Sequence, residues 1–454
     1  MDRRDILQWI SRGALAGGAA ALSPRTLPAG ALAQEPAPAR RGLPPVRIAD
    51  VKTILTAPDG IRLVVVKVTT SEPGLYGLGC ATFTQRAYVV QTAVEQYLKP
   101  FLLGRDADEI EDIWQSSYVS SYWRNGPVLF NAMSGVDQAL WDIKGKRANM
   151  PVYQLLGGKV RKAADLYYHA SGSDFAEVTD QARRAVEQGY RHVRIQVAVP
   201  GVATYGARGA AAPEGEQDGP THPTRVWESG PYVRLLPKLF EHVRRALGDE
   251  LELLHDMHER VTLPEAVQVC RELERYHPYF IEDPLPPEQN DHFRILRQQT
   301  SVPIAMGELF NTQHEYVPLV TGRLIDFIRA HVSQIGGLSM ARKLGALCEF
   351  FGVRTAWHGP GDTSPVGHAA QLALELASHN FGIHEGSGFG AKTEEVFPGC
   401  PAVKDGAMWA SEAPGLGIDV DEKAAARFPF PPGPPNFDYS WGRTRRRDGT
   451  VIRP

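Results

Sequence analysis

The spacing of apolar and polar residues divides the chain into a short mixed region and a longer repeating region. Between Val46 and Thr70 apolar and polar residues alternate and β-branched residues cluster, which predicts strands. From Ala87 to Lys146 the apolar residues recur at helical spacing. Strands followed by helices predict an α+β domain over residues 42–160.

From about Lys162 onward, short apolar segments alternate with amphipathic helical stretches such as residues 264–276 and 338–351. Repeated strand–helix units predict a parallel sheet, and about eight of them predict a closed (β/α)8 TIM-like barrel, here over residues 161–425. The alternative is an open doubly wound sheet, which is disfavoured because no G-x-G-x-x-G motif follows the first strand. The candidate strands are residues 164–168, 192–197, 251–255, 280–281, 304–306, 327–330, 354–357 and 382–383.

Two segments break this rhythm. Residues 198–230 form a long stretch rich in Gly, Ala and Pro, and a loop of that length inside a compact domain is usually functional or disordered. The last segment, residues 426–454, is expected to pack back onto the first domain.

Residues 1–41 have the composition of an export signal and linker. Arg3 and Arg4 precede an apolar stretch rich in Gly and Ala, and an A-x-A pattern ends at Ala33. Paired arginines indicate the twin-arginine route. We expect cleavage near Ala33 and a periplasmic or extracytoplasmic protein, without stable membrane insertion after signal removal because the apolar stretch is short. The alternative is a disordered N-terminal extension.

The composition argues against nucleic-acid binding and against a cysteine-based metal or redox site. The 49 Lys and Arg nearly balance the 52 Asp and Glu, so no basic face is expected for nucleic acid. The four cysteines lie far apart and form no C-x-x-C pair, which argues against a zinc or redox site.

Three acidic residues each follow a predicted strand directly or within two residues. They are Asp256, Glu282 and Glu308, spaced 26 residues apart, which is about the length of one strand–helix unit. Each should therefore lie at the C-terminal rim of the barrel, where barrel enzymes carry their chemistry. Three converging carboxylates would bind Mg²⁺, one per subunit. The alternative is that each acid caps a helix or pairs with a cation at the rim.

Several motifs resemble the enolase superfamily and, within it, the mannonate dehydratase subgroup that includes proteins named starvation-sensing. The resemblance covers nearly all of the chain after residue 45. It implies an N-terminal domain that caps the barrel mouth, Mg²⁺ on Asp256, Glu282 and Glu308, and dehydration of a hexonate such as mannonate to a 2-keto-3-deoxy acid. The motifs are YWRNGP at 122–127, ALWDIKGK at 139–146, PVYQLLGG at 151–158, LLHDMHER at 253–260, WHGPGDTSP at 357–365 and PGLGIDVDE at 414–422.

Dehydration needs a base for the proton beside the carboxylate and an acid for the departing hydroxyl. His258 lies two residues after Asp256 and should face the same cavity; the resemblance makes it the acid. Where many relatives have a K-x-K base motif, this chain has Arg194-Ile-Gln196. The resemblance pairs Arg194 with Tyr205 as the base, and the guanidinium should favour the phenolate.

Further rim positions match those that contact substrate in the family. We expect them to bind the hydroxyls and carboxylate of an acid sugar through charge-assisted hydrogen bonds. They are His169, Arg329, His358, Asp362 and Glu385, with His331 beside them.

The capping loop departs from the family pattern, since Cys80, Thr84 and Ala87 replace an Asp, an Asn and a Glu. Substrate selection therefore stays open. Two other functions also stay open: epimerisation or cycloisomerisation of an acid sugar through the same enediolate, and low-turnover binding or regulation. Epimerisation would require two opposed bases. A homo-oligomer is expected for this family.

Overall fold

The computed structural model describes residues 44–200, 202, 205, 214–217, 223–359, 361, 363–431 and 441–453. The predicted export signal and Asp362 lie outside these residues. The chain divides into two units, Met1–Pro44 and Pro45–Pro454, and all described residues but the first belong to the second unit. Within this described part, no helix has both the length and the apolar character needed to cross a membrane.

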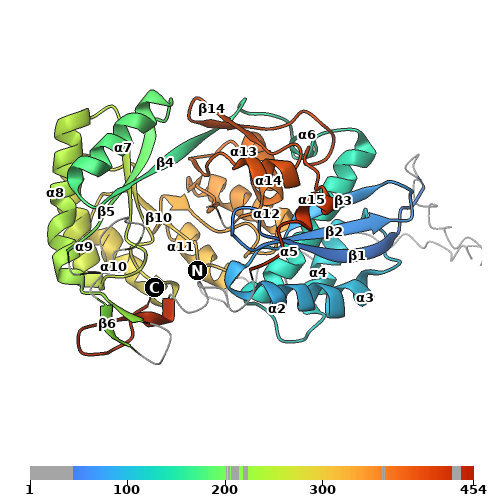
Figure 1. Cartoon of the computed structure of the whole chain (residues 1–454), viewed down its shortest axis with the longest axis horizontal. Helices are drawn as coiled ribbons and strands as arrows, with labels where there is room; N and C mark the ends of the chain where they lie inside the picture. The colour runs from blue at the N-terminus through green and yellow to red at the C-terminus, as the bar shows by residue number, and fades with distance from the viewer. Residues whose placement is uncertain are drawn as a thin grey trace, which may run out of the picture. The chain divides into compact units, whose positions relative to one another are not determined.

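The first domain packs helices against an antiparallel sheet, as predicted (Figure 1). Its core helix α5 lies directly on strands β2 and β3. Glycine permits this contact, because a Cβ at Gly77 or Gly79 would overlap the carbonyl oxygens of Ala139 and Gly135 in α5. The elements are β1 Ile48–Thr56, β2 Leu63–Thr70, β3 Tyr76–Cys80, η1 Thr84–Arg86, α2 Ala87–Thr92, η2 Ala93–Leu98, α3 Lys99–Leu102, α4 Ile110–Val119, α5 Pro127–Ala148 and α6 Val152–Leu155.

The second domain is a closed parallel barrel, which confirms the predicted fold class. Neighbouring strands pair in parallel in the order β4, β5, β8, β9, β10, β11, β12. The ring closes because β13 pairs with β4 and Thr355 of β12 bridges to Phe381, just before β13. The strands are β4 Ala164–Gly172, β5 His192–Val197, β8 Glu252–Asp256, β9 Phe280–Glu282, β10 Ile304–Met306, β11 Phe327–Ile328, β12 Arg354–Thr355 and β13 His384–Glu385.

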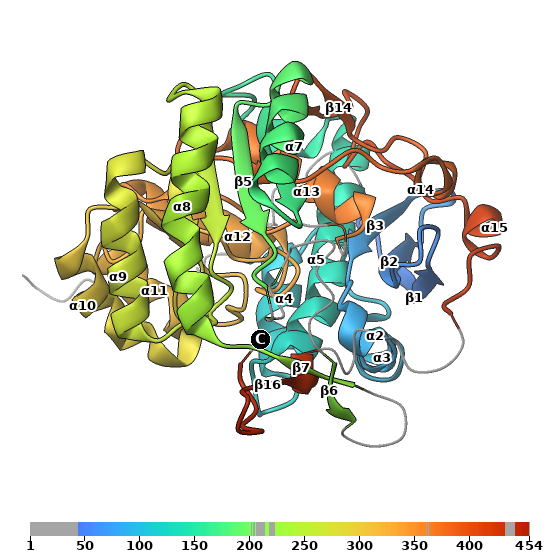
Figure 2. The same cartoon turned by 60° about the vertical axis from the view of Figure 1, so that its left-hand side comes forward.

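The barrel helices lie outside these strands, and Figure 2 shows α7, α8 and α9 next to one another. The predicted helices at 264–276 and 338–351 are confirmed as α9 with η3 and as α12. The elements are α7 Phe175–Glu187, α8 Ser229–Leu247, α9 Leu263–Leu273, η3 Glu274–Tyr276, η4 Pro287–His292, α10 Phe293–Gln299, α11 Gln313–Thr321, α12 Leu338–Phe350, α13 Pro365–Ala377, α14 Ala391–Val396 and α15 Glu422–Ala425.

Two details of the sequence analysis were wrong. The eighth strand was predicted at residues 382–383, but Gly382 bonds to Thr355 and pairing with β4 begins at His384. Residues 198–230 are not one loop, because β6 Glu214–Gln217 and β7 Pro223–Val226 form an antiparallel pair there and α8 already starts at Ser229.

The C-terminal residues contact both domains. Phe428 O accepts a hydrogen bond from Ala57 N (2.7 Å), and Pro431 O accepts one from Arg62 Nη2 (3.0 Å), both in the first domain. Farther along, β16 pairs with β7 beside the barrel. The remaining elements are β14 Ala402–Lys404, β15 Ala407–Trp409, η5 Trp441–Arg443 and β16 Thr444–Arg445.

The three capping-loop residues that differ from the family pattern are buried, and one of them contacts the barrel. Cys80, Thr84 and Ala87 are at most 5% exposed. Cys80 O accepts a hydrogen bond from Ser333 Oγ (3.4 Å), which follows strand β11 of the barrel. The effect of this loop on substrate selection stays a prediction.

Candidate active site

The three predicted acids lie at the C-terminal rim. Asp256 ends β8 and Glu282 ends β9, and the two residues are direct partners in the sheet register. Glu308 follows β10 by two residues. Asp256 and Glu282 are almost fully buried, at 2% and 0% exposure. Negative charge is thus concentrated at the rim, where it requires cations.

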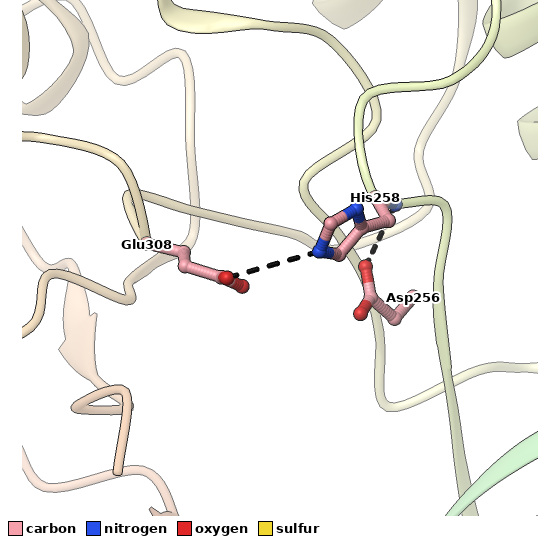
Figure 3. Close-up of side chains that lie close together, drawn as sticks. All are labelled: Asp256, His258 and Glu308. Atoms are coloured by element: carbon pink, nitrogen blue, oxygen red, sulfur yellow. Dashed lines mark hydrogen bonds and ion pairs between the residues drawn. The ribbon is translucent and has the colours of Figure 1, made fainter. Parts of the chain in front are cut away.

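A possible metal site joins two of these acids to His258. Asp256, His258 and Glu308 each offer one ligand atom, and these atoms lie within 4.8 Å of one another. Figure 3 shows Glu308 pointing toward the His258 ring, with 3.8 Å between Oε1 and Nε2. The backbone N–H of His258 donates to Asp256 Oδ1 (2.7 Å).

Glu282 instead pairs with two arginines. Arg194 Nη1 lies 2.8 Å from Glu282 Oε1 and 3.2 Å from Asp256 Oδ2. Arg329 Nε lies 3.2 Å from Glu282 Oε2. Buried carboxylates need such partners, because an uncompensated charge at low dielectric is costly. The role of Glu282 as a metal ligand stays a prediction.

The turn that presents His258 has an unusual backbone. His258, Glu259 and Asp283 have positive φ angles of 48°, 60° and 41°, although none is glycine. Such strain costs of order 1–3 kcal/mol per residue and collects at functional sites. The turn after β8 and the turn after β9 are joined by hydrogen bonds that stabilise this conformation, including one from Glu259 N to Asp283 O (2.8 Å). The sequence argument assumed an extended strand end, so the structure corrects how His258 reaches the cavity.

Arg329 is the fully buried centre of the rim network. Its Nη1 lies 3.1 Å from Asp283 Oδ2 and 3.4 Å from Glu308 Oε2. Its Nη2 lies 2.7 Å from Glu385 Oε2. The Arg329 guanidinium therefore contacts three acids besides Glu282.

The other predicted substrate contacts are joined to this network. His169 bridges Arg194 Nη2, 3.2 Å from its Nδ1, and Glu385 Oε1, 3.1 Å from its Nε2. His358 Nε2 lies 3.4 Å from Glu308 Oε2, and His358 Nδ1 is 2.8 Å from the Nδ1 of His331. The structure thus brings together every predicted site residue that it describes.

The three predicted catalytic side chains are neighbours. The Tyr205 ring stacks on the His258 ring with centroids 3.6 Å apart and planes inclined by 24°. The guanidinium carbon of Arg194 lies 5.9 Å from the Tyr205 ring centroid. Tyr205, His258 and Arg194 therefore lie together at the rim.

Burial dominates the protonation of this site. Burial and the Glu308 carboxylate raise the pKa of Tyr205 well above its usual range, although Arg194 acts in the opposite direction. Arg194 thus favours the phenolate, as expected, but burial and Glu308 outweigh its effect on the pKa of Tyr205. Burial also raises the pKa of Glu308 to about 8 and, with Glu282, the pKa of Asp256 well above its usual range. A bound cation would favour the ionised carboxylates.

Three rim residues were missed by the sequence analysis. Tyr167 donates to Glu282 Oε2 and accepts from Arg329 Nη2, both at 3.3 Å. Asp283 pairs with Arg329, and burial with nearby Asp283 raises the pKa of Glu259 to about 10. Asp283 and Glu259 directly follow Glu282 and His258, so their adjacency was the available signal; Tyr167 lay inside a predicted strand and gave none.

Comparisons with known proteins match this architecture. Residues 177–424 match the enolase C-terminal domain-like family, and residues 38–157 match the mandelate racemase / muconate lactonizing enzyme N-terminal domain. The D-galactonate dehydratase family member RspA from Pantoea ananatis is 50% identical over 416 residues, covering 90% of this chain and 99% of that protein. A D-galactonate dehydratase family member from Salmonella enteritidis is also 50% identical, over 418 residues, with the same coverage.

A solved structure extends the match to three dimensions. The crystal structure of an enolase from Pantoea ananatis with bound D-gluconate and Mg has a TM-score of 0.85 and 50% sequence identity, covering 90% of this chain and 100% of that one. The chain belongs to the mandelate racemase / muconate lactonizing enzyme group of the enolase superfamily.

Proposed function

We propose that this protein is a Mg²⁺-dependent dehydratase of an acid sugar, a lyase that converts a hexonate to a 2-keto-3-deoxy acid. The observation that carries the proposal is the stacked pair Tyr205 and His258 beside the rim carboxylates. The names of the relatives and the gluconate and Mg in the Pantoea structure support it. Mannonate is the first candidate substrate from the sequence motifs, with galactonate and gluconate beside it.

The donor set fits Mg²⁺, which prefers carboxylate oxygens to nitrogen. Asp256 and Glu308 supply such oxygens within one group, and Glu282 lies beside Asp256 in the sheet. These three residues would hold the ion. When bound, Mg²⁺ would hold the substrate carboxylate and stabilise the negative charge that develops on proton removal.

The chain's own groups would move the protons. Tyr205, assisted by Arg194, would take the proton from the carbon next to the carboxylate, and His258 would donate a proton to the hydroxyl on the following carbon, which leaves as water. The stacked rings place the proposed base and the proposed acid next to each other. Arg329, His358 and Glu385 would orient the remaining hydroxyls.

A hexonate panel tests the proposal. Purified protein is incubated with D-mannonate, D-galactonate or D-gluconate, with Mg²⁺ or with a chelator, and keto-acid formation is followed. We expect one hexonate to react only with Mg²⁺, and activity to be lost in Tyr205→Phe and His258→Asn. Proton exchange with solvent without loss of water would instead support an epimerase. Tight binding without turnover would support a binding or regulatory protein.

Export and assembly are proposed with the function. We propose that the twin-arginine segment directs the chain to the periplasm and is cleaved near Ala33. Mass spectrometry of protein from the native host should find an N-terminus near Gln34, and an intact Met1 in the folded product would contradict export. We also propose a homo-oligomer, which light scattering of the purified protein tests.

A further inference from the structure

A small sheet outside the barrel joins strand β7, which lies between Tyr205 and α8 in the chain, to the C-terminal residues. Residues 444–445 of β16 pair in parallel with residues 225–226 of β7. The next loop residue, Trp227, donates its backbone N–H to Arg445 O (2.8 Å). The C-terminal strand therefore fixes the loop at the point where it enters α8.

A side chain strengthens this junction. The carboxylate of Glu228 accepts the backbone N–H of Arg447 at 3.0 Å. The C-terminal residues also bond to one another, since Ile452 N donates to Thr444 O (3.1 Å). Chain ends remain poorly ordered unless specific bonds tie them down. These bonds do so, and they give the C-terminal strand a defined position against the loop.

Trp227 connects this junction to the barrel. Its side chain is buried, at 3% exposure. The indole N–H donates to Arg260 O (3.1 Å), in the turn that also presents His258. The indole also packs 5.2 Å from the ring of Tyr232, whose hydroxyl bonds to His255 in β8. Trp227 therefore couples the loop to the strand end that carries the candidate catalytic histidine.

Arg260 lies between two aromatic rings. Its guanidinium carbon is 5.4 Å from the ring centroid of Trp227 and 5.6 Å from that of Tyr205. A cation over an aromatic face is attracted to it, more strongly where water is excluded. Tyr205 in turn stacks on His258. A continuous set of contacts thus leads from the C-terminal strand to the candidate base and acid.

We propose that Trp227 and Arg260 are positioning residues that hold the Tyr205 ring against His258, and that strand β16 keeps them in place. This rests on the proposed function, because it assigns the proton transfers to Tyr205 and His258. The metal and the substrate would bind through other rim residues. Disturbing the positioning contacts should therefore lower kcat and leave KM and Mg²⁺ affinity nearly unchanged. Misplacing a catalytic group by about 1 Å costs roughly a hundredfold in rate.

The first experiment separates positioning from general damage. Trp227→Phe removes the indole N–H and keeps an aromatic ring. Trp409→Phe is the matched control, because the indole N–H of Trp409 also donates to a backbone carbonyl. That acceptor is Lys404 O (3.4 Å), in the β14–β15 hairpin. We expect Trp227→Phe to lower kcat about fivefold or more, with KM and the Mg²⁺ Kd within about twofold, and Trp409→Phe to match wild type. Unchanged kcat, or equal changes in KM and kcat, would overturn the proposal.

The second experiment tests the cation. Arg260→Met removes the charge and retains an extended apolar side chain, whereas Arg260→Lys restores a positive charge near both rings. We expect about a tenfold loss of kcat in Arg260→Met and a clear recovery in Arg260→Lys. If the lysine variant is as impaired as the methionine variant, the positive charge does not position Tyr205 and this part of the proposal fails.

The third experiment follows the C-terminal strand without relying on turnover. Glu228→Ala removes the acceptor for the backbone N–H of Arg447. Glu274→Ala is the control, because the Glu274 carboxylate also accepts a backbone N–H from a distant segment, that of Ser301 (2.8 Å). Hydrogen exchange should increase in residues 444–452 and in residues 257–260 together in Glu228→Ala alone. Independent exchange in the two segments would overturn the coupling.

The two proposals fail in different ways. If wild type converts no hexonate but the two segments still exchange together, the proposed function fails and the structural coupling stands. If wild type is active and the Trp227 and Arg260 variants match it, the positioning proposal fails and the proposed function stands.

Discussion

Replacing Arg329 with methionine should destabilise the protein in a pH-dependent way. The guanidinium is fully buried and lies within 3.4 Å of oxygens from four carboxylates, those of Glu282, Asp283, Glu308 and Glu385. Methionine fills much of the same space but carries no charge. Removing one partner of a buried ion pair costs about 3–5 kcal/mol, because the remaining charge is left uncompensated.

The cost should fall as the pH falls. Arg329 lowers the pKa values of Asp283, Glu308 and Glu385. Without it these pKa values rise in the folded protein, so the three groups can become neutral by taking up protons. A group whose folded pKa is raised contributes most to stability below its unfolded pKa and loses that contribution as the pH rises. The difference between Arg329→Met and wild type should therefore be largest near pH 8 and smaller near pH 5.

Urea unfolding at several pH values measures this effect. Arg183→Met is the matched control, because its ion pair with Asp180 (2.6 Å) lies at the surface, where such pairs contribute about 0–1 kcal/mol. We expect Arg329→Met to lower the free energy of unfolding by about a third or more of its typical value, and Arg183→Met to leave it almost unchanged. A loss of similar size at pH 5 and pH 8 would refute the electrostatic reasoning and indicate a packing effect.

Three further predictions follow from the same geometry. Tyr205→Phe should lower turnover by about a hundredfold or more with the Mg²⁺ Kd unchanged, measured by keto-acid formation and calorimetry; near-normal turnover would remove Tyr205 as the base. In metal-free protein, the raised pKa of Glu308 (about 8, from 4.5) should make the urea midpoint decrease as the pH rises from 4.5 to 8. Glu308→Gln should have a smaller slope, with the remainder due to the raised pKa values of Asp256 and Glu259, and an equal slope in both proteins would contradict this. Gly79→Ala should lower the thermal midpoint, because its Cβ would overlap Gly135 O in α5; an unchanged midpoint would show that α5 can move.

The sequence predicted the barrel because the strand and helix periods repeat, and repetition survives small errors in any one element. The same regularity located Asp256, Glu282 and Glu308, since equal spacing in a strand–helix repeat means equal position in the barrel. The error at the eighth strand has a local cause. Residues 382–383 are glycine and a buried isoleucine, which looked like a strand, but the pairing with β4 uses His384 and Glu385.

Contacts between distant segments could not be predicted in this way. The sheet beside the barrel takes strands β6 and β7 from a stretch rich in Gly, Ala and Pro, and its third strand, β16, lies more than 200 residues later in the sequence. No local pattern connects them.

The ion pairs of the rim also join distant segments and could not be predicted from local sequence patterns. Arg194 and Arg329 were identified as single residues, but their pairing with Glu282 depends on how closely strands β5, β9 and β11 approach one another in the closed barrel. The protonation of Tyr205 likewise depends on contacts between distant segments. The sequence analysis considered only the neighbouring guanidinium, whereas burial and Glu308 outweigh its effect on the pKa. A divalent cation among the carboxylates would offset Glu308 and so lower the pKa of Tyr205, and the base proposed here should therefore act with metal bound. Activity in the presence of a chelator would therefore contradict both the metal site and the role of Tyr205.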